Sequence, residues 1–348
     1  MINDGATVGW AYVGGRLATD LQDLTSDLDA LDSRGFWVVV ATFEGEFTCA
    51  RFAHVRPAPL PIGRWRGPAR SAWSTSLSYD GYVAAVEAVR AEIAAGEVYQ
   101  VNICRVLTAG LPDLAAAEPA GLATLLAIGN PAPYASVVEL PGISVVSASP
   151  ERFLRRRGSV IESSPIKGTG RVPGDLGDKD HDENVMIVDL VRNDLGRVCE
   201  TGKVAVPELC RVEAHPGLVH LVSTVSGRLR TGVGWAAIFA ATFPPGSVSG
   251  APKSSALRSI RALEPGPRGP YCGAVGWVDA DATTADLAVG IRTFWFTDSA
   301  RAGDDRGLIL RLGVGAGITW ASDPALEWQE TELKAATLLS VASGSTPG

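Results

Sequence analysis

The chain has 348 residues, of which 46% are hydrophobic and 20% charged, and its formal net charge is -7. This composition predicts a globular protein with a large core, and the negative charge with scattered basic residues argues against a nucleic-acid partner. No apolar run approaches the roughly 18 residues of a membrane helix, no signal peptide is visible, and the separated cysteines suit a reducing compartment, so we expect a cytoplasmic protein.

The amino-terminal part reads as a short strand region. Two strand-like runs, 36–42 and 46–53, flank a Glu-Gly pair and predict a hairpin. Residues 56–70 are rich in Pro, Arg and Gly, which predicts a loop or linker. We therefore expect residues 1–70 to form a strand region integrated with a catalytic core over residues 78–341.

The core shows strand-like and helical patterns. The first helix is predicted to begin after Ser78, which can cap it, and to end near Gly96. Asp323 can cap the last helix. Because the strands come in blocks, antiparallel or mixed sheets are favoured over strict alternation with helices. The predicted strands are 98–107, 134–140, 144–148 and 153–161, and the remaining predicted helices are 180–194, 234–242, 253–263 and 324–340.

Two acidic pairs with helical spacing, Asp180 with Glu183 and Glu327 with Glu330, are candidate metal ligands. A separation of three residues puts both carboxylates of a pair on the same face of a helix. Facing helices of this kind would suit Mg²⁺, which commonly takes one or two carboxylates and an anionic group of the substrate. The residues alone equally allow a solvated first turn for the first pair and an ordinary ion pair between Glu330 and Lys334.

Lys167 and Glu151 are the candidate nucleophile and proton donor. Lys167 follows a predicted strand and enters a glycine-rich turn. Its amine attacks carbon only when neutral, which burial or cationic neighbours favour. Glu151 would hold its proton longer in apolar surroundings. A solvated lysine, and a surface ion pair of Glu151 with Arg152 or Arg155, are the simpler alternatives.

Two glycine-rich stretches suggest close contact between backbone and ligand. Residues 246–255 superficially resemble a P-loop, but the GxxxxGK[ST] spacing is missing and Pro252 removes an amide donor, so we reject nucleotide binding. Their backbone amides could instead hold a carboxylate, and Arg292 could bind a second one. Residues 313–317 indicate either close approach of backbone to ligand or a tight turn.

Several segments taken together resemble the chorismate-utilising enzyme family, over most of the chain from about residue 78 to 339. Each segment alone is weak evidence for the family, whereas the occurrence of all of them in this order is specific to it. They are GEVYQVN at 96–102, SPERF at 149–153, PIKGT at 165–169, ENVMIVDL at 183–190, HLVST at 220–224, SGAPK at 249–253, IRT at 291–293 and QET at 329–331.

The resemblance implies an α/β (α+β) fold in which two antiparallel sheets pack as a sandwich, with helices outside and the active site in a cleft. It implies that Mg²⁺ bridges a substrate carboxylate and Glu183 and Glu330, with Asp180 and Glu327 close by. It makes Glu151 the acid at the departing 4-hydroxyl group of chorismate. The other residues that it implies for the site are His220 as a polar wall and Thr169, Gly250, Ala251, Tyr271, Arg292, Gly315, Gly317 and Lys334 as substrate contacts.

Within this family, the motif PIKGT, which contains Lys167, resembles that of the aminodeoxychorismate synthases. Anthranilate and isochorismate synthases generally have PIAGT at this place. Gln100 stands where isochorismate and salicylate synthases carry a lysine base, and a neutral amide cannot activate water in that way. The resemblance implies a covalent lysine intermediate, with ammonia from a separate glutamine amidotransferase subunit. The product would supply p-aminobenzoate, for folate or for a specialised aromatic pathway.

Two other readings stay open. The nearest is anthranilate synthase component I or another chorismate-utilising enzyme. The second is a non-catalytic scaffold subunit, which would need neither Lys167 nor Glu151. The amino-terminal region is shorter than the usual lead-in of the family, so we predict no tryptophan feedback site.

Overall fold

A computed structural model describes residues 9–170, 172–215, 218–299 and 307–344, and the side chain of Thr169 is not among what it describes. Over these residues, eighteen strands form a single hydrogen-bonded network. They are β1 (Trp10–Val13), β2 (Arg16–Thr25), β3 (Phe36–Ala41), β4 (Phe47–Pro57), β5 (Ser74–Thr75), β6 (Gln100–Gly110), β7 (Tyr134–Leu140), β8 (Ile143–Ser149), β9 (Arg152–Arg157), β10 (Val160–Ser164), β11 (Ile166–Gly170), β12 (Cys199–His215), β13 (Leu218–Leu229), β14 (Gly250–Ala251), β15 (Ala274–Asp279), β16 (Thr284–Val289), β17 (Thr293–Ser299) and β18 (Gly307–Ile318).

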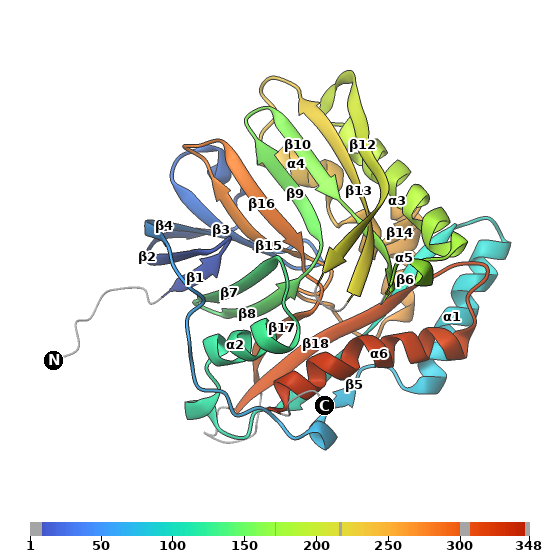
Figure 1. Ribbon diagram of the computed structural model, residues 1–348, viewed down its shortest axis with the longest axis horizontal. Coiled ribbons are helices and arrows are strands. Elements are labelled where there is room, and N and C mark those ends of the chain that lie inside the picture. Colours follow the sequence, from blue (N-terminus) through green and yellow to red (C-terminus); the bar gives the residue numbers. More distant parts are fainter. Residues whose placement is uncertain (1–8, 171, 216–217, 300–306, 345–348) are drawn as a thin grey trace.

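The pairings between these strands are antiparallel, and they follow one path through the molecule. From β12 and β13 the path passes through β10, β9, β16 and β15 to β3, β4 and β2. It continues through β1, β7, β8, β17 and β18 to β6. The mixed α/β architecture is as expected. The division into two separate sheets is not confirmed, because the amino-terminal strands connect the two halves of the network: β3 pairs with β15, and β1 pairs with β7 (Figure 1).

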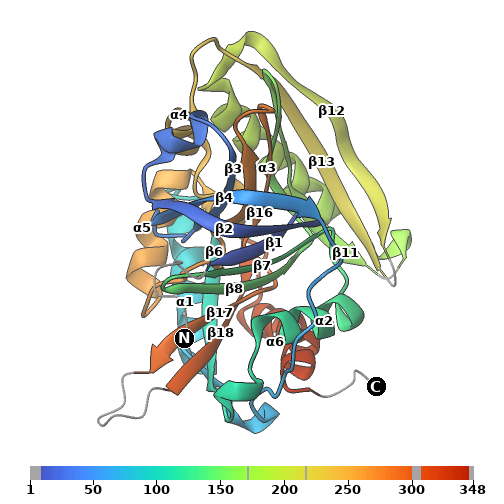
Figure 2. The ribbon, with the colours of Figure 1, turned by 90° about the vertical axis from the view of Figure 1, so that its left-hand side faces the viewer.

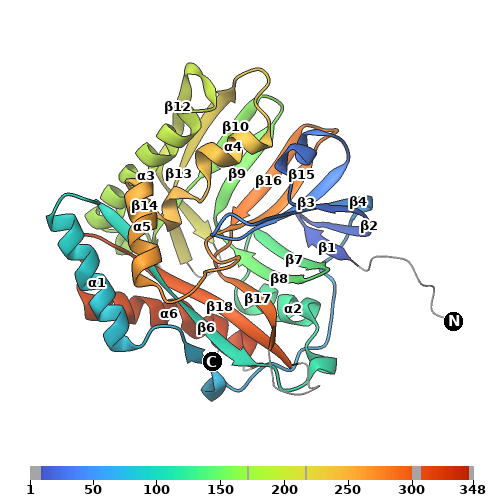
Figure 3. The ribbon, with the colours of Figure 1, turned by 180° about the vertical axis from the view of Figure 1, so that it is seen from behind.

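The helices cover the strands on more than one side. α1 (Tyr79–Ala94) and α6 (Pro324–Ala342) pack against β6 and β18, and α2 (Pro119–Gly129) packs on β8. α3 (Asp178–Gly196) lies along the long hairpin of β12 and β13, which Figure 2 shows from the side. α4 (Trp235–Thr242) and α5 (Lys253–Leu263) cover the reverse side in Figure 3.

Local sequence signals explain where several helices begin. The Ser78 hydroxyl oxygen accepts a hydrogen bond from the backbone N–H of Gly81 at 3.2 Å, and α1 follows directly, as predicted. Asp323 accepts hydrogen bonds from the backbone N–H groups of Ala325 and Leu326 at 3.0 Å and opens α6, also as predicted. α5 has the predicted bounds. These caps fix the starts of the helices that flank β6 and β18.

Other elements differ from the prediction. The predicted single strand 153–161 is a hairpin of β9 and β10 that turns at Gly158, which has a φ of 59°. The segment 313–317 lies inside β18 rather than in a turn. β1, β2 and the long β12–β13 hairpin were not predicted from sequence. Charged residues are spaced irregularly along β12, and its register with β13 shifts repeatedly, which hides the period of two.

The core consists of two hydrophobic clusters. The larger cluster contains Trp37, Tyr82 and Phe239. In the smaller cluster, Leu122 of α2 and Leu338 of α6 pack against β8, β17 and β18. Within the part of the chain that the structure describes, no helix has both the length and the apolar character needed to cross a membrane.

Candidate active site

A cavity of about 680 Å³ brings together residues that are far apart in the sequence. β11 and β18 contribute to its walls, the first turns of α3 and the middle of α6 face it, and loops before β9 and β17 close it. Acidic residues of two helices therefore face the strands β11 and β18 at one place. Of the residues singled out from sequence, those that line the cavity are Glu151, Lys167, Asp180, Glu183, His220, Tyr271, Arg292, Gly315, Gly317, Glu330 and Lys334.

Lys167 points from β11 into this cavity. Its Nζ atom lies 3.7 Å from Oε2 of Glu183, and the two side chains are 14% and 17% exposed. A Cβ atom on Gly317 would lie 3.4 Å from the same Nζ and 2.3 Å from Nε2 of Gln100. Glycine at 317 therefore leaves the space that the lysine amine and the Gln100 amide occupy.

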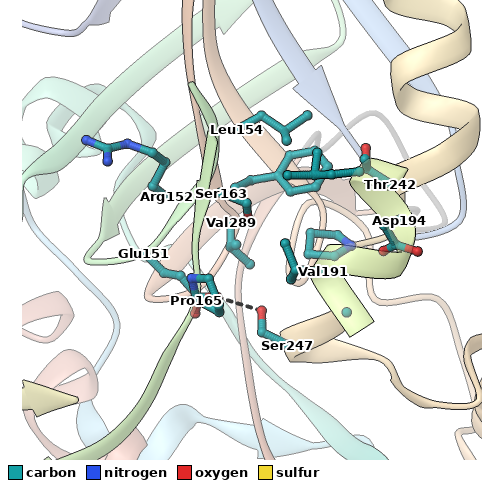
Figure 4. Close-up of a pocket in the computed structure, with 14 residues that line it drawn as sticks. Glu151, Arg152, Leu154, Ser163, Pro165, Val191, Asp194, Thr242, Ser247 and Val289 are labelled. Atoms are coloured by element: carbon teal, nitrogen blue, oxygen red, sulfur yellow. Dashed lines mark hydrogen bonds between the residues drawn. The ribbon is translucent and has the colours of Figure 1, made fainter. Parts of the chain in front are cut away.

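Glu151 is buried, with an exposed fraction of 4%. Ser247 Oγ donates a hydrogen bond to its Oε1 at 2.5 Å, and Figure 4 shows this contact beside the apolar side chains of Val191 and Val289. Burial raises the pKa of Glu151 to about 7, although the Ser247 hydrogen bond and the nearby Lys167 amine both oppose that rise. The carboxyl group is thus able to hold a proton near neutral pH.

Carboxylates from two helices face the cavity. Glu183 comes from α3 and Glu330 from α6. Asp180 also lines the cavity, but its Oδ2 accepts a hydrogen bond from the backbone N–H of Gly177 at 2.9 Å and so caps α3. Among the described residues no cluster of three or more His, Cys, Asp or Glu side chains has the spacing of a metal site. The donors suit a hard cation held by one or two carboxylates together with a ligand.

Lys334 extends the polar rim along α6. Its Nζ lies 2.6 Å from Oε1 of Glu330 and donates a hydrogen bond to the backbone oxygen of Gly315 at 3.0 Å. The lysine thereby joins α6 to β18 across the cavity edge. The ion pair predicted as the simpler reading of Lys334 is present, and the residue also lines the cavity.

Arg292 and Tyr271 both line the cavity, and the arginine makes it suited to an anion. Arg292 adopts a φ of 50°, unusual for a residue with a side chain, and its Nη1 donates to Oδ1 of Asn130 at 3.4 Å. Burial lowers the pKa of Arg292. Burial also raises the pKa of Tyr271 well above its usual value, and its ring fills the space above Gly313. Arg292 thus offers a guanidinium to the cavity, whereas the charged and polar groups that act on the Tyr271 phenol are Cys104, Cys272 and Arg268.

The structure does not bring every predicted residue to the cavity. Glu327 is 4% exposed and accepts a hydrogen bond from Ser322 Oγ at 2.6 Å, at the start of α6 and outside the cavity lining. Gly250 and Ala251 form β14, which pairs with β6 and is likewise outside the lining. The side chain of Thr169 lies outside the described residues.

Comparison with known proteins agrees with this arrangement. The profile of the family described as chorismate binding enzyme matches residues 59–340. The chain belongs to the chorismate binding enzyme family. The matched segment contains every residue assigned above to the cavity.

Individual relatives within the chorismate binding enzyme family carry different names. The chain is 40% identical over 282 residues to an aminodeoxychorismate synthase of Streptomyces griseus, covering 77% of this chain and 37% of that protein. It is 38% identical over 271 residues to an anthranilate synthase component 1 of Haloarcula marismortui, covering 74% and 53%. The chain thus spans about a third to a half of the length of these relatives.

The fold also has a solved counterpart. The structure described as a putative 2,3-dihydroxybenzoate-specific isochorismate synthase, DhbC, from Bacillus anthracis, matches with a TM-score of 0.77, at 22% identity, over 97% of both chains. At this level of identity the likeness shows the fold of the chorismate binding enzymes and no particular activity.

Sequence reasoning missed several residues of this chorismate binding enzyme site. Ser247 lies in the 246–255 stretch that had been singled out, but no signal distinguished its contact with Glu151. Asn102 and Asn130 line the cavity, as does Leu333, whose side chain lies on α6 next to Lys334. Asn102 lies inside β6, and Asn130 follows the last residue of α2, where asparagine is common, so spacing alone could not identify them.

Proposed function

We propose that this chain acts as component I of an aminodeoxychorismate synthase, replacing the 4-hydroxyl group of chorismate by an amino group. The observation that carries the proposal is the Lys167 amine, which lies in the cavity together with the buried acid Glu151. Most other features of the cavity would serve any chorismate-utilising enzyme. A lysine amine at this place supplies a nucleophile, which an alanine would not.

In the first step, the neutral Lys167 amine adds to C2 of chorismate and forms a C–N bond. The ring double bond shifts, the bond from C4 to its hydroxyl group breaks, and Glu151 donates the proton with which that group leaves as water. The buried position of Glu151, which raises its pKa to about 7, supports this role. The step leaves a covalent lysine adduct.

In the second step, ammonia adds at C4 and the electrons return through the double bond to expel the Lys167 amine. The product is 4-amino-4-deoxychorismate, with the enolpyruvyl group intact, and the sum of both steps exchanges water for ammonia. Splitting one difficult displacement into two easier ones is the advantage of covalent catalysis. We propose that ammonia comes from a separate glutamine amidotransferase subunit or directly from solution.

We propose Mg²⁺ as the cofactor, held by Glu183 and Glu330 with Asp180 nearby. When bound, the cation would neutralise and anchor a carboxylate of the dianionic substrate. Arg292, Tyr271 and Lys334 supply the protein's own donors to the substrate, and they orient the ring relative to Lys167. Glu327 is omitted from the ligands because it lies outside the cavity lining.

Product analysis tests the proposal directly. The protein is incubated with chorismate, Mg²⁺ and ammonium, and the products are identified by mass and chromatographic standards. We expect 4-amino-4-deoxychorismate as the main product. Anthranilate would instead assign the chain to anthranilate synthase, and isochorismate or salicylate would place it among the enzymes that add water. No turnover under these conditions would favour the scaffold reading.

Substitution of Lys167 tests the nucleophile. The Lys167→Ala variant is expected to lose formation of 4-amino-4-deoxychorismate and of any covalent adduct trapped after acid quench, while its thermal unfolding stays close to that of the wild type. Lys203→Ala, at an exposed position on β12, is the matched control and should keep both. Wild-type rates in Lys167→Ala would refute the covalent mechanism.

A further inference from the structure

A buried ion pair lies behind the cavity wall and is not used by the proposed chemistry. The side chains of Arg268 and Glu264 are 1% and 6% exposed, and Nη2 of the arginine is 2.6 Å from Oε1 of the glutamate. Arg268 Nε donates to the other carboxylate oxygen at 2.8 Å, so the contact is bidentate. Neither side chain is among the described residues that line the cavity.

Two further N–H groups of this guanidinium donate to the backbone of the cavity wall. Nη1 of Arg268 donates to the oxygen of Val248 at 2.9 Å, and Nη2 donates to the oxygen of Asn102 at 2.6 Å. Val248 and Asn102 both line the cavity, yet they belong to different segments of the chain. Oε1 of Glu264 in turn accepts a hydrogen bond from the backbone N–H of Cys104 at 2.9 Å. The pair therefore joins β6 to the turn that contains Val248, in addition to the backbone hydrogen bond that the Asn102 N–H donates to the oxygen of Ser249 at 2.9 Å.

The position of that turn affects the geometry of the acid. Val248 directly follows Ser247, whose Oγ donates the 2.5 Å hydrogen bond to Glu151. We infer that Arg268 is a positioning residue: it holds Ser247, and through it Glu151, in the geometry needed for proton transfer. The inference rests on the proposed function in giving Glu151 the role of the acid. A planar guanidinium is suited to this task because it makes several directed hydrogen bonds at once.

A purely stabilising role for the pair makes a different prediction. Replacing a buried ion pair by apolar residues of similar volume is often neutral for folding, whereas removing one partner alone strongly destabilises a protein. A double replacement thus separates the two roles. If the pair only stabilises the fold, a folded chain without it should turn over chorismate as fast as the wild type.

The first test is Arg268→Lys, which keeps the charge beside Glu264 but lacks the planar group that reaches both carbonyl oxygens. We expect chorismate consumption, as kcat/KM, to fall about 10- to 100-fold, because small misplacements of catalytic groups have effects of this size. The basic limb of the pH profile of kcat should move to higher pH as Glu151 loses the Ser247 hydrogen bond. Arg261→Lys, at an exposed position on α5, is the matched control and should keep the wild-type rate and profile.

The second test combines Arg268→Met with Glu264→Leu, with folding checked by circular dichroism and thermal unfolding. We expect a folded protein with a loss of activity similar to that of Arg268→Lys. Wild-type kcat and an unmoved pH limb in either folded variant would overturn the inference. If neither variant folds, the pair is a folding element, and the positioning role is rejected.

The readout in both tests is consumption of chorismate, independent of which product forms. If the wild type makes a product other than 4-amino-4-deoxychorismate, the proposed function fails, and the effect of Arg268→Lys on consumption still reports on the cavity wall. If the wild type makes the proposed product and Arg268→Lys is as active, only the inference about Arg268 fails.

Discussion

Glu151 and Lys167 line the same cavity, and their chemistry depends on the surroundings of Glu151. Burial dominates at Glu151 and raises its pKa to about 7, against the opposing effects of Ser247 and of the lysine amine. A general acid acts in its protonated form, so the rate should depend on how much of the carboxyl group still carries a proton. The loss of rate with rising pH is therefore a readout of the Glu151 carboxyl group.

We predict that kcat falls as the pH rises through about 7, because Glu151 then loses the proton that it must donate. Glu151→Gln keeps the size of the side chain but cannot act as an acid, and it should lower kcat by roughly 10²- to 10⁴-fold. The measurement is kcat from pH 5.5 to 9 at saturating chorismate and ammonia. A rate that stays flat over this range, or an active glutamine variant, would argue against the acid role.

At the scale of elements, α6 matters most for the site because it carries Glu330 and Lys334. Its start depends on Asp323, which accepts two backbone N–H groups of the first turn. Asp323→Ala is expected to lower the free energy of unfolding by about 1 kcal/mol, whereas Asp323→Asn, which still accepts hydrogen bonds, should lose less. Urea unfolding measures both. Equal losses in the two variants would show that capping is not what Asp323 contributes.

Elements with a strong local signal were predictable from the sequence, and those without one were not. Ser78 and Asp323 combine a cap with apolar periodicity, and α1 and α6 begin where those signals stand. β9 and β10 were predicted as one strand because the strand-like pattern continues on both sides of Gly158, where the chain turns. β12 escaped notice because bulges break its alternation. Where pairing with neighbouring strands determines the ends of a strand, the sequence of that strand alone does not predict them.

The site was predictable to a similar degree. Lys167, Glu151 and the acidic residues Glu183 and Glu330 were identified from motifs and spacing, and the fold brings them to one cavity. Glu327 lies three residues before Glu330, yet its carboxylate contacts Ser322 instead of the cavity. Side chains three residues apart on a helix share a face only approximately. Contacts such as that of Arg268 with two backbone carbonyl groups depend on the assembled sheet, so no sequence motif predicts them.

For the whole molecule, burial of carboxyl groups links function to stability. Glu139 on β7, which is hydrogen-bonded to Ser144, has a pKa raised by burial to about 7, as does Glu151. In the unfolded chain a glutamate has a pKa of about 4.3, so between these values the folded state binds more protons. The free energy of unfolding should then decrease as the pH rises from about 4.3 to 7, by about 1–3 kcal/mol for each group.

Glutamine at either position removes the proton that is exchanged, so Glu139→Gln and Glu151→Gln should each flatten this dependence and be more stable than the wild type at pH 8. Thermal and urea unfolding at pH 5 and pH 8 provide the measurement, with Glu46→Gln at an exposed position as the control. The argument would be contradicted if the free energy of unfolding of the wild type increased from pH 5 to pH 8 and both variants showed the same increase. If Glu151→Gln is both more stable and inactive, the acid is a group that the fold retains at the expense of stability, for the sake of catalysis.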